Sequence, residues 1–348
     1  MHSVDFLIIG QGLAGSLMAF ELLARGKSVL VVDKEHKGSA SKVAAGLINP
    51  ITGHRLNITD GFYSFNKQAI PFYKSIETKL KIKIYRELDQ TRLIKNQGQF
   101  DYLQKRLQES QYQPILRNHT KTDGWFSDVS KNAFGAINVE HTAIINTSEL
   151  LQGIKEWLSE RNSLRNTEFD YQQIQDKNKQ VIYQDISAKK IIFCEGYQAL
   201  NNPWLKNLPF KTAKGEILTV KLNQQSVSRM LSWGHWLVPL ANGNFKLGSN
   251  YIWNDLDLNM NSETPNKFIS SLTNQTGLEA TLIEHETGIR PSTTQRIPFI
   301  GKISSLENAY CFNGLGSKGC LLAPTYTRLL ADHLIEGKPI PEELTRWL

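Results

Sequence analysis

The sequence predicts an α/β fold, with α+β character, in which a sheet of parallel strands is interrupted by a second, antiparallel sheet. Two observations predict this arrangement. The first 33 residues follow the order strand, glycine-rich turn, helix, strand and acidic residue. Further along the chain, segments of alternating apolar and polar residues lie between segments that are typical of buried parallel strands.

The N-terminal segment has the layout of a Rossmann-like, dinucleotide-binding βαβ unit. The apolar run Phe6–Ile9 leads into three glycines, and a second apolar run ends at Asp33. Gly10 permits a tight turn, Gly12 allows the backbone to approach a pyrophosphate, and Gly15 allows the helix to pack close to the strand. The pattern predicts a bound dinucleotide; a glycine turn with a purely structural role is the alternative.

The residues around this turn are further candidate cofactor-binding residues. Leu13 and Ala14 begin the helix, whose free N–H groups and positive dipole end favour phosphate. Asp33 and Lys34 end the second strand, and the Asp33 carboxylate is expected to accept hydrogen bonds from ribose hydroxyls.

Composition and charge describe an ordinary globular chain. Apolar residues make up 40% of the sequence, and no run of about 18 apolar residues predicts a transmembrane helix. Asp5 interrupts the N-terminal apolar stretch, which therefore fits a strand better than a signal peptide. Three scattered cysteines are too few for a disulfide framework or a metal site. We expect a cytoplasmic protein with no metal ion and no membrane partner.

The net charge of +7 is compatible with two kinds of surface. A basic face attracts acidic ligands, including nucleic acid. A lysine-rich surface that is only solvated is the alternative, since the lysines are spread along the chain.

The rest of the chain shows both kinds of sheet. Residues 62–85 have an amphipathic helical pattern, and another helix is expected to begin near Asn146, with Glu149 as its capping-box partner. Residues 189–196 form an apolar run ending in glycine, which is typical of a buried parallel strand. A strand over 308–312 and a helix over 320–337 are expected near the C-terminus. Antiparallel strands are predicted at Ile217–Lys221, Trp236–Pro239 and Phe245–Gly248.

A second glycine-rich turn precedes the C-terminal helix. It contains Gly314, Gly316, Ser317, Lys318 and Gly319. Such a turn at a helix N-terminus stabilises an anion. A simple Rossmann dehydrogenase does not need a second one, whereas a reduced flavin carries negative charge on its ring. The helix dipole contributes about 0.3–1 kcal/mol there, and the Lys318 ammonium adds to it. A packing turn is the alternative.

Together these motifs resemble the D-amino-acid oxidase and glycine oxidase superfamily of FAD-dependent amine oxidoreductases. The resemblance covers most of the chain. Besides the two glycine turns, the matching segments are Ala40–Gly46, Phe193–Gly196, Lys214–Glu216, Gly288–Pro291 and Ile297–Gly301.

Two further details are similar to the oxidase half of the bifunctional tRNA 5-methylaminomethyl-2-thiouridine biosynthesis proteins. They are Leu315–Gly319 followed by Ala323-Pro324, and Lys338–Pro341 near the end of the chain. Those enzymes oxidise carboxymethylaminomethyl-uridine in tRNA. Their fused methyltransferase domain has no counterpart in this sequence, so the resemblance leaves tRNA as a second possible partner beside a small amine.

The resemblance implies FAD as the cofactor and a discontinuous domain organisation. The FAD-binding domain is expected to comprise residues 1–75, 145–210 and 285–348, and the substrate-binding domain residues 76–144 and 211–284. Candidate cofactor-binding residues are Gly10, Gly12, Leu13, Ala14, Gly15, Asp33, Lys34, Ser41, Ala45, Gly46, Gly196, Gly314, Gly316, Ser317, Lys318 and Gly319.

The resemblance also assigns the substrate carboxylate to Arg290, the arginine of the Gly-x-Arg-Pro motif. A guanidinium group pairs two N–H donors with two carboxylate oxygens and so orients the substrate. Orientation matters because hydride transfer requires the substrate C–H to point at flavin N5 at near-contact distance. The implied reaction oxidises the C–N bond of a small amino acid or N-carboxymethyl amine to an imine, which water hydrolyses. A structural salt bridge is the alternative role for Arg290.

Other side chains are candidates for the catalytic and substrate sites. His235 is a candidate catalytic group, and Lys318 aligns with a lysine that supports oxygen reduction in sarcosine oxidases. Trp236 and Tyr251 are candidate substrate-binding residues. Packing is the alternative role for both aromatic residues and for His235.

Three functions follow from these observations. The first is oxidation of a small amine that bears a carboxylate, and the second is oxidation of a modified uridine in tRNA by a stand-alone enzyme. The third is a non-catalytic flavoprotein. They differ in what reduces the flavin: a small amine, modified tRNA or neither.

Overall fold

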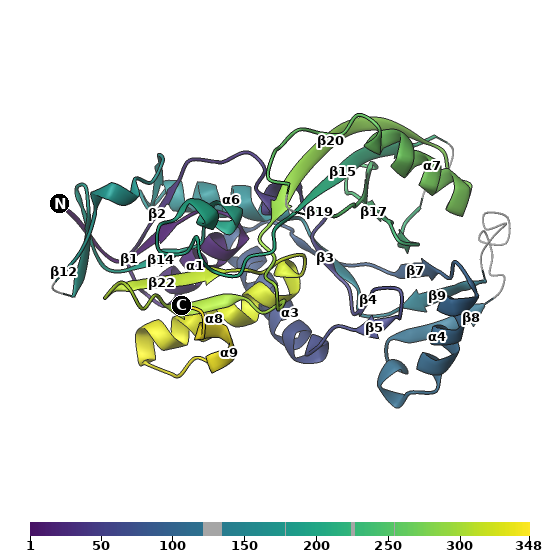
Figure 1. Ribbon diagram of the computed structural model, residues 1–348, viewed down its shortest axis with the longest axis horizontal. Coiled ribbons are helices and arrows are strands. Elements are labelled where there is room, and N and C mark those ends of the chain that lie inside the picture. The colour runs from purple at the N-terminus through teal and green to yellow at the C-terminus, as the bar shows by residue number, and fades with distance from the viewer. Residues whose placement is uncertain (121–133, 178, 224–226, 254) are drawn as a thin grey trace.

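In the computed structural model, residues from the start, the middle and the end of the chain form the centre of one sheet (Figure 1). The structure describes residues 1–120, 134–177, 179–223, 227–253 and 255–348. β1 (His2–Ile9) pairs in parallel with β2 (Val29–Asp33) on one side and with β14 (Ile186–Phe193) on the other. β14 also pairs in parallel with β22 (Ala309–Asn313). The predicted βαβ unit is thereby confirmed. The strands predicted over 189–196 and 308–312 are also confirmed, although β14 ends at Phe193 and β22 at Asn313.

The central strands of this sheet are buried on both faces. Phe6 and Ile8 pack into one hydrophobic cluster, and Leu7 and Ile9 pack into another on the opposite face. This burial explains the unbroken apolar run that the sequence shows. The outer strands are β11 (Leu164–Asn166), which is parallel to β2, and the antiparallel strands β12 (Ile174–Lys177), β13 (Gln180–Tyr183) and β21 (Phe299–Lys302).

A second sheet takes nine strands from the described residues, in the order β19-β15-β18-β17-β16-β7-β9-β8, with β20 also paired to β15. The segments predicted as antiparallel strands lie in β15, β17 and β18, which pair antiparallel, so this prediction is confirmed. The strands are β7 (Gln90–Leu93), β8 (Leu116–Thr120), β9 (Ala136–Val139), β15 (Ala213–Leu222), β16 (Met230–Ser232), β17 (Trp236–Pro239), β18 (Phe245–Gly248), β19 (Ile252–Trp253) and β20 (Ala280–Arg290).

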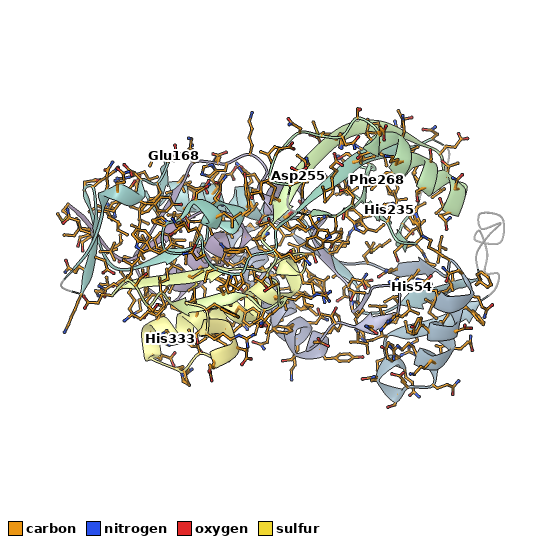
Figure 2. The ribbon with its side chains drawn as sticks, viewed as in Figure 1. His54, Glu168, His235, Asp255, Phe268 and His333 are labelled. Atoms are coloured by element: carbon orange, nitrogen blue, oxygen red, sulfur yellow. The ribbon has the colours of Figure 1, made fainter. Side chains whose placement is uncertain are left out.

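Two helices bury hydrophobic side chains of the second sheet. α7 (Thr264–Thr276) contributes Phe268 and Leu272 to a cluster with Trp233. Figure 2 labels Phe268 and His235, whose ring centroids lie 4.6 Å apart. α4 (Gln97–Leu107) contributes Leu103 to a separate cluster.

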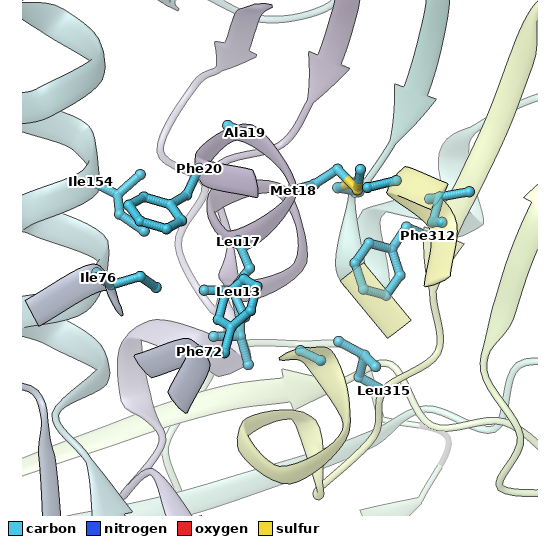
Figure 3. Close-up of a cluster of buried hydrophobic side chains, with 14 of the residues drawn as sticks. Leu13, Leu17, Met18, Ala19, Phe20, Phe72, Ile76, Ile154, Phe312 and Leu315 are labelled. Atoms are coloured by element: carbon cyan, nitrogen blue, oxygen red, sulfur yellow. The ribbon is translucent and has the colours of Figure 1, made fainter. Parts of the chain in front are cut away.

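Several helices pack together against the first sheet. α1 (Leu13–Ala24) contacts α6 (Thr147–Ser159) and α8 (Gly319–Glu336), and α3 (Phe62–Leu80) contacts α8. This packing fixes α1 with its N-terminus beside the end of β1. Figure 3 shows part of the shared cluster, including Leu13, Leu17, Phe20, Phe72, Ile76, Ile154, Phe312 and Leu315.

The predicted boundaries of two helices are confirmed. α6 begins after Asn146, whose side-chain oxygen accepts a hydrogen bond from the Glu149 backbone N–H at 3.2 Å. This bond satisfies one of the free donors of the first turn. α8 corresponds to the predicted C-terminal helix and ends where Gly337 adopts a left-handed conformation, with φ +73°.

The helix predicted over 62–85 is shorter than expected. α3 ends at Leu80, and Lys81 adopts a left-handed φ of 58°. The Glu77 carboxylate accepts hydrogen bonds from the backbone N–H groups of Ile84 and Tyr85, at 2.8 and 2.9 Å. These bonds turn the chain back, and Tyr85 then begins a strand.

Short elements complete the fold. Within the described ranges, no helix has the length and apolar character needed to cross a membrane. The short elements are α2 (Ala40–Val43), β3 (Leu47–Ile48), β4 (Ile51–Thr52), β5 (Asn57–Ile58), β6 (Tyr85–Glu87), η1 (Ser110–Tyr112), β10 (Ala143–Ile145), η2 (Tyr171–Gln173), η3 (Gly196–Asn201) and α9 (Glu342–Thr345).

The chain alternates between the two sheets, so the second sheet is inserted into the first, Rossmann-like one. This confirms the predicted fold class. β20 pairs with β15 up to the pair Arg290–Ala213. Residues 285–290, which the sequence assigns to the FAD-binding segment, therefore lie in the second sheet, and β20 ends where the two sheets meet (Figure 1).

Candidate functional site

The glycine turn after β1 brings the start of α1 close to the end of β14. Gly10 has a left-handed φ of +99°, and a Cβ there would lie 2.6 Å from the carbonyl oxygen of Cys194. A Cβ at Gly15 would lie 1.8 Å from the carbonyl oxygen of Gly10. Both positions therefore require glycine, and the predicted close packing at Gly15 is confirmed. At Gly12 the nearest atom, Ser41 Oγ, would be 3.5 Å from a Cβ, which is ordinary contact.

The start of α1 presents backbone N–H groups beside this turn. Gly12 is the N-cap and supplies no side-chain cap. The N–H of Leu13 donates a hydrogen bond to Ser41 Oγ at 3.0 Å. Backbone donors at a helix N-terminus, together with the helix dipole, favour a phosphate group.

The carboxylate of Asp33 closes the turn from the end of β2. Its Oδ2 accepts a hydrogen bond from the Gln11 backbone N–H at 2.8 Å, and its Oδ1 accepts one from the Glu35 backbone N–H at 2.6 Å. The expected contact of Asp33 with ribose hydroxyls stays a prediction.

A cavity of about 440 Å³ lies beside the turn and extends to the seam between the two sheets. Its walls include the turn after β1, α2 and the residues that follow it, and, from the second sheet, parts of β15 and the end of β20. This volume lies within the range of about 300–1,000 Å³ that is typical of ligand and cofactor sites.

Most of the candidate residues line this cavity. Those that do are Gly10, Gly12, Leu13, Ala14, Asp33, Lys34, Ser41, Ala45, Gly46, Gly196, Trp236, Tyr251, Arg290, Gly316, Ser317, Lys318 and Gly319. Gly15, Gly314 and His235 do not line it. Gly15 packs against Gly10, and a Cβ at Gly314, whose φ is +82°, would lie 2.8 Å from Thr293 Cγ2.

His235 is partly buried beside Phe268 of α7 (Figure 2) and does not line the cavity. Its ring packs on Phe268, and its Nδ1 is buried without a hydrogen-bond partner. Burial lowers the pKa of His235 and so favours the neutral imidazole. The next residue, Trp236, begins β17 and lines the cavity, because successive side chains of an extended segment point to opposite faces. The structure therefore does not bring His235 to the candidate catalytic site.

Lys318 is the N-cap of α8 and brings a second helix N-terminus to the cavity. Burial lowers the pKa of Lys318, and the nearby Asp60 carboxylate opposes this effect. Its ammonium group forms no ion pair with any described carboxylate. The turn before α8 is fixed by a hydrogen bond from the Gly316 N–H to the Pro291 carbonyl oxygen at 3.3 Å.

Arg290 ends β20 at the seam, with its guanidinium group in the cavity wall. Nη1 donates to the Asn250 carbonyl oxygen at 3.1 Å, and Nη2 donates to Ser249 Oγ at 2.9 Å. The guanidinium carbon lies 4.3 Å from the ring centroid of Tyr251, a cation–π contact. Among the described residues, no carboxylate pairs with Arg290. Burial lowers its pKa, but an arginine stays protonated at physiological pH.

The sequence did not single out Glu195, which also lines the cavity. Tyr171 Oη donates to Glu195 Oε1 at 2.5 Å, and Asn202 Nδ2 donates to Oε2 at 2.8 Å. Burial raises the pKa of Glu195 to about 7, although the two hydrogen bonds act in the opposite direction. An acidic residue directly after a buried strand was the available signal, but its partners come from segments that only the fold brings together.

Comparison with known proteins identifies the class of this protein. Residues 5–333 match the family model DAO, described as FAD dependent oxidoreductase. The chain belongs to this family, so it is an FAD-dependent oxidoreductase, and FAD is its cofactor.

Individual relatives are similar to the chain over nearly its whole length. A glycine oxidase from Pseudomonas aeruginosa is 23% identical over 96% of this chain and 95% of its own. A tRNA 5-methylaminomethyl-2-thiouridine biosynthesis bifunctional protein from Leptospira interrogans is 22% identical over 97% of this chain and 58% of its own. The crystal structure of iminodiacetate oxidase from Chelativorans sp. BNC1 has a TM-score of 0.80 and 20% identity, covering 99% of this chain and 98% of its own; this likeness shows the fold.

The residues present fit FAD. Gly10 and Gly15 hold a backbone arrangement that a Cβ would prevent, two helix N-termini face the cavity, and the cavity has a suitable volume. These features suit an elongated ligand that carries two phosphates and an electron-rich ring.

Proposed function

We propose that this enzyme oxidises the C–N bond of a small amino acid or N-carboxymethyl amine, with Arg290 binding the substrate carboxylate. The observation that carries the proposal is the guanidinium group of Arg290, which faces the cavity with no described carboxylate as a partner. A largely buried cation of this kind attracts an anionic ligand.

The contacts of Arg290 leave room for such a ligand. A guanidinium group has five N–H donors. Of these, one on Nη1 and one on Nη2 are used by neutral acceptors, at Asn250 and Ser249. Those bonds and the ring of Tyr251 fix the orientation of the group. A carboxylate bound to the remaining donors would hold the adjacent amine-bearing carbon in a defined direction.

We further propose how the cavity residues hold FAD. The Gly12 N–H and the positive end of the α1 dipole would bind the pyrophosphate, and Asp33 and Lys34 lie where the ribose half would reach. The N-terminus of α8 at Lys318–Gly319 would stabilise the reduced ring. FAD, when bound, would supply the acceptor for the hydride, which carries both electrons that the substrate loses, and the amine N–H proton would pass to solvent.

The remaining cavity residues determine what the site accepts. Trp236 and Ile217 contribute apolar surface to the wall, so they limit the substrate side chain and exclude water. A neutral amine requires no dedicated general base to be oxidised, which is consistent with the absence of His235 from the described cavity lining. Water then hydrolyses the imine product.

The names of the relatives support this substrate class. Glycine and iminodiacetate both carry a carboxylate one carbon away from the amine nitrogen. The same unit forms the carboxymethylamino group, so one arginine serves all three.

A second candidate substrate is a carboxymethylaminomethyl-uridine in tRNA, as the similarity to the Leptospira protein suggests. One observation favours it. Tyr251 at the cavity and Trp253 beyond it are 49% and 47% exposed, and their rings stack with centroids 5.8 Å apart. Lys211 Nζ lies 4.8 Å from the Trp253 centroid. Exposed aromatic rings beside a cation suit stacking of nucleobases.

The experiment is an anaerobic titration of the holoenzyme, followed by flavin absorbance. The ligands are glycine, sarcosine, iminodiacetate and several D-amino acids, with ethylamine as a control that lacks the carboxylate. Reduction by a carboxylate-bearing amine but not by ethylamine supports the proposal. Reduction only by tRNA that contains the carboxymethylaminomethyl group supports the second candidate, and reduction by none of them contradicts both.

A further inference from the structure

The carboxyl group of Glu195 lies at the cavity wall beside the glycine turn. β1 and β14 are neighbouring strands, and Glu195 follows the end of β14 by two residues. A Cβ at Gly10 would lie 3.4 Å from the Cα of Glu195, so the two backbones are in contact. Asn313 Nδ2 donates to the Gly196 carbonyl oxygen at 2.8 Å and fixes this segment. Glu195 therefore lines the cavity next to the glycine turn, and the helix that follows this turn favours phosphate.

The partners of Glu195 are neutral. Its two oxygens accept hydrogen bonds from Tyr171 and Asn202, and no described cation forms an ion pair with it. Most partly buried carboxylates at a cavity wall pair with a cation or bind several backbone donors. Burial instead raises the pKa of Glu195 to about 7.

The titratable groups that interact with Glu195 or with its partner Tyr171 are neutral or acidic. Cys194 on β14 and Cys311 on β22 are buried thiols whose pKa values are raised by burial, so they stay neutral. The negative charge of Glu168 contributes to the raised pKa of Tyr171. The Glu168 carboxylate itself pairs with Lys34 at 2.5 Å.

Asp33 faces the same cavity from the end of β2, with its carboxylate bound to backbone N–H groups. A dinucleotide adds two phosphate charges to this cavity, which Lys34, Lys42 and Lys318 also line. Lys34 pairs with Glu168, and no described cation pairs with Glu195, so an ionised Glu195 would still repel the phosphates.

We propose that Glu195 is protonated when FAD occupies the cavity, so that cofactor binding takes up a proton from solvent onto this carboxyl group. Protonation removes the negative charge beside the phosphates. It also lets Glu195 donate to Tyr171 Oη, which frees the hydroxyl hydrogen of Tyr171 for an acceptor in the cavity that Tyr171 lines. The inference rests on the assignment of the cavity to FAD and is independent of the substrate.

The test measures FAD binding to the full-length apoprotein without substrate, so its outcome is separate from that of the proposed function. Ultrafiltration gives the dissociation constant at pH 6, 7 and 8. For the wild type, we expect binding about tenfold weaker at pH 8 than at pH 6, because the apoprotein must regain the proton. Glu195→Gln, which is neutral at every pH, should bind FAD with little change over this range.

A matched control addresses His36, a second polar side chain that lines the same cavity. His36→Gln should keep the pH dependence of the wild type. An unchanged slope in Glu195→Gln, or a slope lost in His36→Gln, would overturn the inference.

Calorimetry gives a second readout that needs no variant. The heat of FAD binding at pH 7, measured in buffers with different ionisation enthalpies, counts the protons taken up. We expect about half a proton per FAD at pH 7 and nearly one at pH 8. A binding heat that does not depend on the buffer would refute proton uptake, even if Glu195→Gln failed to fold.

Discussion

The guanidinium group of Arg290 lies directly over Gly215, where a Cβ would be 2.2 Å from Nη2 and 2.3 Å from Nη1. In the pairing of β15 with β20, Arg290 is opposite Ala213, and Gly215 is opposite Gly288. The Arg290 side chain thus crosses diagonally to the next position of β15, a distance that long side chains reach. Glycine at position 215 makes this arrangement possible.

Gly215→Ala should therefore impair substrate binding. The methyl group would displace the guanidinium group, because the clash is with a charged head that two hydrogen bonds hold in place. We expect KM for a carboxylate-bearing amine to rise about tenfold or more, through loss of a charge-assisted hydrogen bond, with FAD content retained. Steady-state kinetics and the flavin-to-protein absorbance ratio measure both quantities.

Gly98→Ala is the matched control for that variant. A Cβ at Gly98 would have its nearest atom at 3.7 Å, and the residue lies in α4, away from the cavity. This change should leave KM unaltered. An unchanged KM in Gly215→Ala would show that the position of Arg290 does not matter for the substrate.

Removing the charge of Arg290 should have a larger effect. For Arg290→Ala, we expect kcat/KM for the carboxylate-bearing amine to fall roughly 10- to 150-fold, which corresponds to about 1.5–3 kcal/mol. Arg290→Lys keeps the charge but loses the two-pronged geometry, so it should recover only part of this loss. Arg229→Gln, which changes an arginine that does not line the cavity, should behave as the wild type. Equal kinetics for Arg290→Ala and the wild type would rule out the anchoring role.

The glycine turn allows folding and cofactor binding to be separated. Gly15→Ala places a methyl group 1.8 Å from the Gly10 carbonyl oxygen, and overpacking of this kind costs about 1–3 kcal/mol or more. We expect a lower melting temperature for the apoprotein. Gly12→Ala makes only ordinary contact, so the apoprotein should be as stable as the wild type while FAD affinity falls. Thermal unfolding of both apoproteins and FAD titration test this, and a destabilised Gly12→Ala apoprotein would argue against it.

The buried imidazole of His235 should make stability depend on pH. Its pKa is lowered in the folded state, so the unfolded chain binds more protons between the folded and the unfolded pKa values. His235 should therefore leave the free energy of unfolding unaffected above about pH 6.5 and should lower it as the pH falls below this value. His235→Gln should weaken this decline and leave turnover unchanged. Urea unfolding at pH 5 and pH 7 measures the first effect, and loss of turnover with FAD retained would restore a catalytic role for His235.

The sequence predicted those parts of the fold that depend on local patterns. The glycines of the first turn, the cap at Asn146 and the alternating strands each have a signal within a few residues. The end of α3 was not predicted, because it depends on the Glu77 carboxylate binding backbone that lies beyond the helix.

A place in the cavity lining was predicted where a motif carries the residue, as for Arg290, whose role towards the substrate stays a prediction. It was not predicted where tertiary contacts decide. Burial in the folded chain raises the pKa of Glu195, and its hydrogen-bond partners, Tyr171 and Asn202, come from separate segments. The orientation of His235 depends on which face of β17 its neighbour Trp236 occupies, and the sequence pattern alone does not determine that.

The central claim is that Arg290 selects an amine by its carboxylate. The most direct measurement is the rate of anaerobic flavin reduction in wild type and Arg290→Ala, with sarcosine or the best carboxylate-bearing amine and with its analogue that lacks the carboxylate. We predict that the wild type prefers the carboxylate-bearing amine strongly and that Arg290→Ala loses most of this preference while retaining FAD. A preference of the same size in both proteins would contradict the claim.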